Sequence, residues 1–497
     1  MNKQHLQSTK RIKLSFFSTL LFFPLFLLNA QEKLSLTFEE ALALAKQNSP
    51  EISQARFALE RSHELVNAQE ASLKSRFGLN LEPFYYNHQS EFNTLFSTWN
   101  TTETKSYSGT ISIEQPIIWT DGTISLNNQF GWINSKSDLL DTQQETFSNN
   151  LYLSYNQPIF TYNRTKMGLE EVELDLENAL LNYQLQELEL EVAVAQNFFQ
   201  SYQNKMSLQV AREDYQNRQL SYEIIKNKVD AGLAAMEELY QAELDLTTSQ
   251  SQVQNDQVIL QNSLDELKRL LGLNITDEID VFAEIVQEEV KVDLDSALTF
   301  GLKNRMEIRQ RDINLSLSEF NVTRAAAVNE FLGNISLTYG LIGADEQLKE
   351  VFNTPTKNQR ASITFQVPIY DWGERSSRIK AAEASVKQSK LNVSEQKKLI
   401  LIGIRRAYRN LQNQVIQIEL AQQNVESAQL TYDINLERYR NGDLTSMDLN
   451  LIQNQLSQRK IGLVNAMINY KLSLLDLKIE SLWDFEKNRP ALAPVPN

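Results

Sequence analysis

Apolar residues recur at alternating steps of three and four along most of this chain. One such series is Leu188, Val192, Ala195, Phe199, Tyr202 and Met206. The spacing places these side chains on one face of an α-helix, where they pack against a neighbouring helix. Series of this kind predict helices over residues 37–76, 164–230, 234–271, 294–330, 375–440 and 444–483.

The lengths of these helices predict the shape of the molecule. A helix of about 66 residues is roughly 100 Å long, whereas one of about 40 residues is roughly 60 Å long. A short helix cannot cover its long neighbour, but two short helices stacked end to end can. The simplest assembly is therefore a long rod of paired helices.

Between the helices, apolar and polar residues alternate with a period of two. In 331–339, one face carries Phe331, Gly333, Ile335, Leu337 and Tyr339. The other face carries Asn334, Ser336 and Thr338. We expect strands of about ten residues, the length of a transmembrane β-strand, within 77–160 and 331–368. Polar linkers at 88–106 and 340–359 separate them.

The chain repeats itself once. "QPIF" with Pro158 matches "VPIY" with Pro368, and the turn at Gly232 matches the turn at Gly442, both with a shift of 210 positions. The segment 36–52 matches 292–308 with a shift of 256, so the first half carries an insertion of 46 residues. The pattern predicts two structural repeats, 31–290 and 291–483, with a C-terminal tail at 484–497.

The insertion has its own strand pattern. Residues 109–132 contain two alternating runs around Asp121-Gly122, a dipeptide typical of hairpin turns. This would give four strands in the first half and two in the second.

The N-terminus has the pattern of a secretory signal peptide, 1–30. A basic start with Lys10, Arg11 and Lys13 precedes the apolar stretch 14–28 and the sequence "LNAQE". A membrane anchor is the alternative interpretation, but 15 apolar residues are short for a membrane span. Cleavage after Ala30 removes four positive charges, which changes the net charge from −15 to −19. This acidity argues against a nucleic-acid partner.

The chain contains no cysteine, so we expect neither disulfides nor an N-terminal lipid anchor. A soluble sandwich and a membrane-spanning barrel both show alternating strands. The secretion signal, the polar linkers and the lack of disulfides favour the barrel. Without the insertion, each half has two strands, too few to close a barrel. Open edges are not tolerated in lipid, so we expect several copies to close one ring.

Each half contains a proline where a strand meets a long helix. Pro158 and Pro368 are expected to end the strand ladder, because proline lacks the N–H that would continue it. The aromatic residues Phe160 and Tyr370 follow them at positions expected for an aromatic girdle at a membrane boundary.

The duplicated order, the two proline–aromatic joints and the two glycine turns resemble the TolC-type outer-membrane efflux protein family. The resemblance implies a mostly α protein with an additional β part, closed as a homotrimer. Long antiparallel helical hairpins form a periplasmic α-barrel, joined to a β-barrel in the lipid of the outer membrane of a Gram-negative bacterium. It also implies a periplasmic adaptor and an inner-membrane pump as partners, in efflux or in type I secretion.

In this family the two glycine turns are the periplasmic tips that contact the adaptor. The corresponding residues here are Ala231, Gly232, Leu233, Ala234, Asn441, Gly442, Asp443, Leu444, Thr445 and Ser446. The resemblance makes Asp448 a pore-constriction residue, with Glu238 as its counterpart in the first repeat; a solvated helix charge is the alternative.

The chain departs from the family in three places. Leu451 and Leu444 stand where well-known members have a second acid and an arginine, so the gating network does not carry over whole. The family has four strands per subunit, whereas this sequence predicts six. Either the barrel is larger, or the extra hairpin lies elsewhere.

Nothing in the sequence indicates an enzyme, a cofactor or a metal site. Only His63 and His88 remain after the signal, and nucleotide-binding, nucleophile-elbow and metal-spacing motifs are missing. A secreted coiled-coil adhesin without a channel is the alternative function. The sequence does not distinguish drugs, metals or proteins as cargo.

We expect the mature protein to begin near Gln31 and to carry no lipid. N-terminal sequencing and intact mass of the membrane-extracted protein test this. Retention of residues 1–30, or a mass increased by acyl chains, would contradict it.

Overall fold

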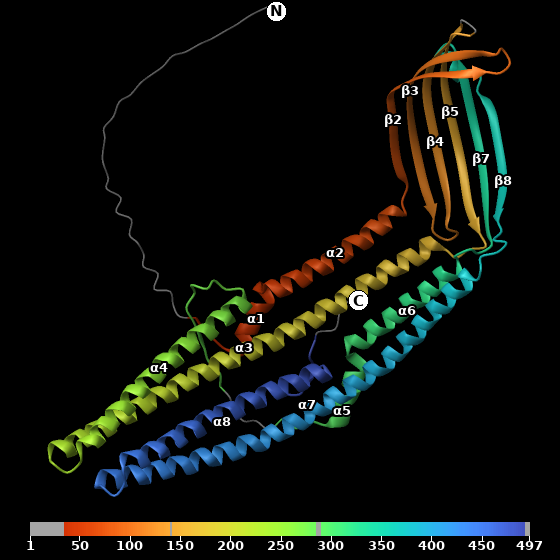
Figure 1. Cartoon of the computed structure of the whole chain (residues 1–497). Helices are drawn as coiled ribbons and strands as arrows, with labels where there is room; N and C mark the ends of the chain where they lie inside the picture. Colours follow the sequence, from red (N-terminus) through yellow and green to blue (C-terminus); the bar gives the residue numbers. More distant parts are fainter. Residues whose placement is uncertain (1–33, 140–141, 285–289, 493–497) are drawn as a thin grey trace, which may run out of the picture.

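The computed structural model describes residues 34–139, 142–284 and 290–492. A bundle of long helices carries a β-sheet at one end, and both hairpin tips lie at the other (Figure 1). The proposed signal 1–30 and the last five residues of the tail lie outside the described part.

The sheet has six antiparallel strands, in the order β2-β3-β4-β5-β7-β8. They are β2 (Arg76–Asn93), β3 (Thr98–Ile117), β4 (Gly122–Ser137), β5 (Thr142–Ile159), β7 (Leu332–Asp345) and β8 (Thr356–Gln366). The repeat matches β2 to β7 and β5 to β8. The insertion is therefore the hairpin β3–β4, which lies inside the same sheet, and the expectation of six strands is confirmed.

The register separates an apolar from a polar face. Leu126 on β4 pairs with Ile113 on β3 and with Leu153 on β5, so apolar side chains adjoin across the strands. One residue along, Ser125 pairs with Ser154, and the opposite face is polar. The same division continues to β8, where Ile335 faces Ile363 and Ser336 faces Ser362. The apolar side chains are largely exposed in the single chain.

The strands are longer than expected. Most of the segment 88–106, expected to be a linker, belongs to the paired strands β2 and β3, and 340–359 contains the end of β7 and the start of β8. The expectation was wrong because most residues of 88–106 are polar on both faces. Apart from the aromatic pair Phe92 and Trp99, their cross-strand pairs join polar or charged side chains, so the alternation is weak while the backbone ladder continues.

Eight α-helices are described. They are α1 (Phe38–Asn48), α2 (Pro50–Ser72), α3 (Arg164–Asp230), α4 (Met236–Leu271), α5 (Leu294–Asn304), α6 (Met306–Ala326), α7 (Glu374–Asn441) and α8 (Ser446–Ser481). The helices expected at 37–76 and 294–330 are each broken in two. The first break is at Pro50, which starts α2 because its missing N–H is harmless in a first turn. The second is at Arg305, whose backbone is extended.

The helices form a rod in which each long helix is covered by two shorter ones. α3 packs against α2 near the sheet and against α4 near the tip, and α7 packs against α6 and α8 in the same way. α3 also contacts α6 and α8, which joins the two halves. The end-to-end stacking expected from the lengths is confirmed.

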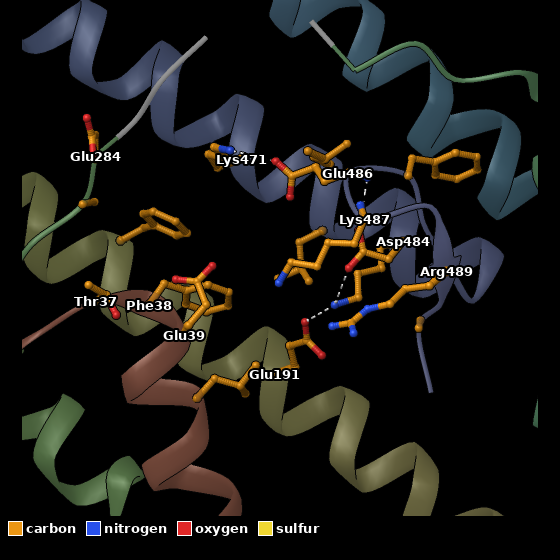
Figure 2. Close-up of a pocket in the computed structure, with 18 of the residues that line it drawn as sticks. Thr37, Phe38, Glu39, Glu191, Glu284, Lys471, Asp484, Glu486, Lys487 and Arg489 are labelled. Atoms are coloured by element: carbon orange, nitrogen blue, oxygen red, sulfur yellow. Dashed lines mark hydrogen bonds and ion pairs between the residues drawn. The ribbon is translucent and has the colours of Figure 1, made fainter. Parts of the chain in front are cut away.

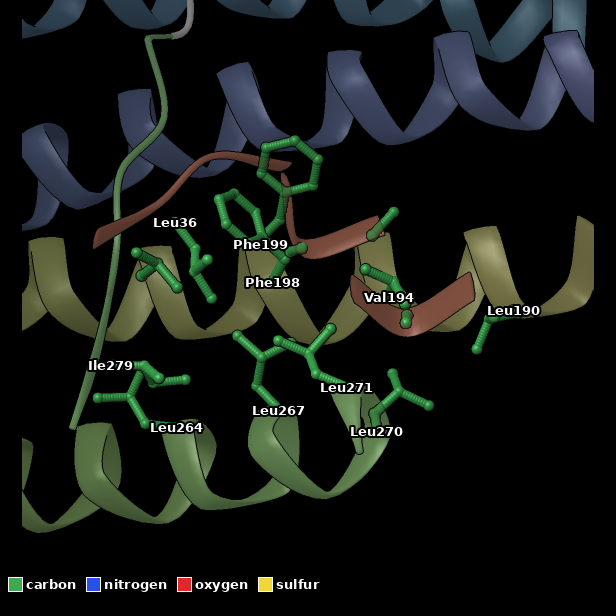
Figure 3. Packing of buried hydrophobic residues seen from close by; sticks show 14 of the residues in the cluster. Leu36, Leu190, Val194, Phe198, Phe199, Leu264, Leu267, Leu270, Leu271 and Ile279 are labelled. Carbon is green, nitrogen blue, oxygen red and sulfur yellow. The ribbon is translucent and has the colours of Figure 1, made fainter. Parts of the chain in front are cut away.

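The main apolar core lies at mid-height of the rod, where α1, α3 and α4 meet (Figure 3). Val194, Phe198, Leu267 and Leu271 are fully or almost fully buried there. A short parallel pair, β1 (Leu34–Leu36) with β6 (Ile279–Val281), closes this core and was not expected from the sequence. The small elements η1 (Glu350–Phe352), β9 (Trp483–Asp484) and β10 (Arg489–Pro490) complete the chain.

Candidate functional site

The two tips are helix–helix turns built around glycine. Gly232 and Gly442 have φ angles of +71° and +89°, in the left-handed region that glycine favours. After each glycine, the next N–H returns to the helix: Leu233 donates to the Lys228 carbonyl at 2.7 Å, and Asp443 donates to the Arg438 carbonyl at 2.9 Å. No heavy atom lies within 4 Å of a Cβ built on either glycine, so both tips are open on this side.

The helices that leave the tips begin differently. At α8, the Thr445 hydroxyl accepts from the Asp448 N–H at 3.2 Å and donates to the Asp448 carboxylate at 2.7 Å. At α4, Ala235 stands at the cap position and offers no side-chain hydrogen bond. Asp448 is exposed, and Glu238 is half-buried in the first turn of α4. In the single chain, Thr445 therefore caps α8, and the Asp448 carboxylate holds the capping hydroxyl.

Tyr439 fixes the second tip to the first hairpin. Its side chain is 1% exposed, and burial raises the pKa of its phenol to about 12. Lys228 on α3 donates to the Tyr439 carbonyl at 2.9 Å, and its ammonium lies 5.0 Å from the centre of the ring. The two tips are thus held side by side by a hydrogen bond and a cation–π contact.

A polar contact above the tips also links the two hairpins. Asp214 on α3 pairs with Arg218 at 2.7 Å and accepts a 2.8 Å hydrogen bond from Gln453 on α8. Arg218 donates to Asn454 at 2.7 Å. Gln453 is 2% exposed, and a buried amide of this kind needs partners. The sequence analysis missed this cluster, although Gln453 lies among apolar core positions.

The inserted hairpin braces the first joint between sheet and rod. Its turn residue Asp121 accepts hydrogen bonds from the Thr165 N–H at 2.9 Å and from the Thr165 hydroxyl at 2.5 Å, so it caps α3 from 44 positions away. Gln115 donates to the Leu73 carbonyl at the end of α2 at 2.9 Å. One hairpin therefore supports both α2 and α3.

The second joint depends on a local cap. Asp371 accepts from the N–H groups of Gly373 and Arg375 at 2.9 and 3.0 Å. The Arg375 guanidinium donates to the Ala326 carbonyl at the end of α6 at 2.8 Å.

The prolines at the joints do not behave alike. Pro368 follows the last residue of β8 by two positions, as expected. Pro158 does not end the ladder, because it still pairs with Asn334 and the strand continues to Ile159. It is tolerated because the β4 side of the pairing has already ended at Asn156.

The aromatic residues at the joints form two groups. Phe160 lies 5.4 Å from the ring of Phe331, which stacks on Phe365. Tyr370 packs edge-on against Trp372 at 4.8 Å, and both are strongly exposed. The positions suit a girdle, which stays a prediction.

A cavity of about 420 Å³ lies at mid-height between α1, α3, α8 and the C-terminal segment (Figure 2). Lys478 on α8 pairs across it with Glu191 at 2.7 Å and with Asp484 at 3.6 Å. Lys471 pairs with Glu486 at 2.8 Å. These neighbouring opposite charges fasten the C-terminal segment to the rod.

Residues 34–139, 142–284 and 290–492 contain no group of three or more histidine, aspartate or glutamate side chains placed to hold a metal ion. In the same part of the chain, no helix is apolar enough over a sufficient length to cross a bilayer.

The family model "Outer membrane efflux protein" matches residues 121–273 and 301–478, well over half of the chain. The chain belongs to this outer membrane efflux family. The match begins at the turn of the inserted hairpin, and α1, α2, β2 and β3 precede it. Membership makes the protein a transport protein and not an enzyme.

Individual relatives are distant. "Cation efflux system protein CusC" of Escherichia coli K12 is 24% identical over 263 residues, which cover 52% of this chain and 56% of the relative. "Probable outer membrane lipoprotein SilC" of Salmonella typhimurium is 24% identical over 253 residues, with 50% and 52% covered. The chain thus matches only about half the length of these curated relatives.

The fold is shared over a longer stretch. The crystal structure of the Campylobacter jejuni CmeC outer membrane channel superposes with a TM-score of 0.68 at 16% identity. The superposition covers 89% of this chain and 85% of that one. The superposition shows that the two chains share one fold over most of their lengths.

We expect Asp121→Ala to loosen the first joint of this efflux protein. Loss of a helix cap costs about 1 kcal/mol, so the unfolding temperature should fall by a few degrees. Asp138→Ala is the control, because Asp138 is exposed at the opposite end of β4. Thermal unfolding followed by circular dichroism measures both; equal effects would show that Asp121 does not act as a cap.

Proposed function

We propose that three copies of this chain form an exit duct through the outer membrane. The observation that carries the proposal is the sheet: one face is apolar, the other is polar, and β2 and β8 each have a neighbouring strand on one side only within the described residues. A sheet of this kind is stable in lipid only when its edges are closed. Its apolar face would contact lipid and its polar face would line water.

Three six-stranded sheets would form a barrel of 18 strands. Barrels of about 16–18 strands enclose an aqueous channel instead of a packed interior. The inserted hairpin thus widens the proposed barrel beyond the 12 strands that three four-stranded subunits would give. The polar face offers mainly neutral serine, threonine and asparagine side chains, which suits passage without selection of a single ligand.

The helical rod would extend through the periplasm. α3 has 67 residues, which corresponds to about 100 Å. We propose that its tips, Ala231–Ala234 and Asn441–Ser446, dock a periplasmic adaptor that connects the duct to an inner-membrane pump. The open glycine turns and their position at the end of the rod support this. The assembly would serve tripartite efflux or type I secretion, and the pump would select the cargo.

The test is fractionation followed by conductance. We expect the protein in the outer membrane, as a trimer that resists mild detergent and dissociates on heating. The purified trimer should open stable channels in planar bilayers. A water-soluble monomer, or a trimer that conducts no ions, would contradict the proposed duct.

The same recordings test the proposed ring of three Asp448 carboxylates. Like charges held close together attract cations, so Asp448→Ala should reduce cation preference. Glu426→Ala on α7 is the control, because Glu426 is exposed 16 residues before Gly442. Equal small effects in both variants would leave Asp448 only as the partner of the Thr445 cap.

If the tips dock the adaptor, a change at a tip should reduce efflux without affecting trimer assembly. A side chain at positive φ costs about 1–2 kcal/mol, so Gly442→Asp should distort the tip and leave the sheet intact. We expect trimers at normal yield in the outer membrane, with efflux reduced at least several-fold in cells that depend on this duct. Ser377→Asp, on the exposed first turns of α7 near the sheet, is the control. Normal efflux with Gly442→Asp, or loss of the trimer, would refute the tip assignment.

A further inference from the structure

The chain has two long flanks that lack a neighbour from the described residues. Around the lower rod the helices follow one another as α4, α3, α8 and α7, and near the sheet as α2, α3, α6 and α7. The first flank therefore consists of β2, α2 and α4, and the second flank consists of β8 and α7 (Figure 1).

The outer face of α4 on the first flank carries apolar residues. Ala242, Ser249 and Leu260 are buried on the inner side of the helix. Tyr240 and Leu244 lie on the opposite side of the same turns and are 63% and 61% exposed.

Farther from the tip, the outer face of α4 becomes polar and then apolar again. Val258 is also on this face and is 59% exposed. Between Leu244 and Val258 the face is polar, with Ser251 at its centre.

The outer face of α7 on the second flank shows the same order of apolar, polar and apolar residues. Ile418 and Tyr432 are buried on the inner side. Opposite them, Ile434, Leu430 and Ile416 are 55–62% exposed. Ser427 and Gln423 form a polar interval between them, and Leu420 completes the apolar part above it.

The positions on the two flanks correspond when they are counted from the tips. Tyr240 and Leu244 lie eight and twelve residues after Gly232, and Ile434 and Leu430 lie eight and twelve residues before Gly442. Ser251 and Gln423 are each 19 residues from their glycine, and Val258 and Ile416 are each 26 residues away. The turns α3–α4 and α7–α8, which contain these glycines, lie at the same end of the rod (Figure 1).

We infer that the first flank of one copy packs against the second flank of the next along a seam with two apolar bands. The lower band consists of Tyr240, Leu244, Leu430 and Ile434, and the upper band of Val258, Leu420 and Ile416. A polar break at Ser251, Gln423 and Ser427 separates the bands. The inference rests on the proposed trimer and specifies which helix faces build it.

The self-matching pattern identifies a second copy as the occupant. Rotation about a common axis keeps every residue at its height, so bands on two flanks of one chain meet only if they lie at equal distances from the tip. An unrelated partner, such as an adaptor helix, would bind one flank and would not require the other to carry the same pattern. The seam also continues the β2 and β8 edges, which need a partner of the same kind.

Cysteine pairs test the seam, and the chain has no cysteine of its own. Leu244→Cys with Leu430→Cys probes the lower band, and Val258→Cys with Ile416→Cys probes the upper band. A disulfide needs Cβ atoms about 3.5–4.5 Å apart, so oxidation of the assembled protein in membranes should give covalent dimers and trimers on non-reducing gels. Leu244→Cys with Asp433→Cys is the control. Asp433 lies on α7 beside Ile434, but its side chain points about 100° away from that of Ile434. This pair should cross-link at least tenfold less.

The outcomes separate the seam from the trimer itself. A heat-modifiable trimer without cross-links in either seam pair would overturn the seam and leave the proposed duct standing. Monomers before and after oxidation would overturn both. Cross-links that equal those of the control pair would show random collision instead of a seam.

A second measurement compares the effect of an added charge in an apolar band with its effect in the polar break. Leu244→Asp places a charge in the lower band and should lower the dissociation temperature of the trimer by several degrees. Ser251→Asp, in the polar break, should lower it by less than half as much. Equal shifts for the two variants would contradict the division into bands.

Discussion

The structure depends on the hydrogen-bonding requirement of two sheet edges. Within the described residues, β2 and β8 each have a strand on one side only, and every backbone N–H or C=O exposed to lipid costs several kcal/mol. In the proposed trimer, pairing of these edges between neighbouring copies would close the ring. The ring would in turn fix the direction of the rods and bring their tips together.

Much of this architecture could be predicted from the sequence, because periodicity directly reports which side of an element is apolar. Alternation at Ile335, Leu337 and Tyr339 predicted the two faces of the sheet, and the turn at Asp121 predicted the extra hairpin. The upper parts of β2 and β3 could not be predicted, since side chains that are mostly polar on both faces weaken the signal while backbone pairing continues. The break at Arg305 also carries no local signature, unlike the break at Pro50.

The candidate site divides in the same way. The glycine turns were predictable because a left-handed residue between two helices favours glycine. The contact of Asp214 and Arg218 with Gln453 was not, since it joins positions 239 residues apart and depends on how the two hairpins pack. Asp448 illustrates an intermediate case: its place in the first turn of α8 was visible, but its capping contact with Thr445 required coordinates.

The brace at Asp121 also bears on the order of folding. Asp121 and Thr165 are 44 residues apart, so the start of α3 gains this cap only after the β3–β4 turn has formed. Contacts of this separation form slowly, because the intervening chain must first be ordered. The bond from Thr165 to Asp121 is therefore added late, with the sheet, to a first turn that the local cap Asn163 already supports.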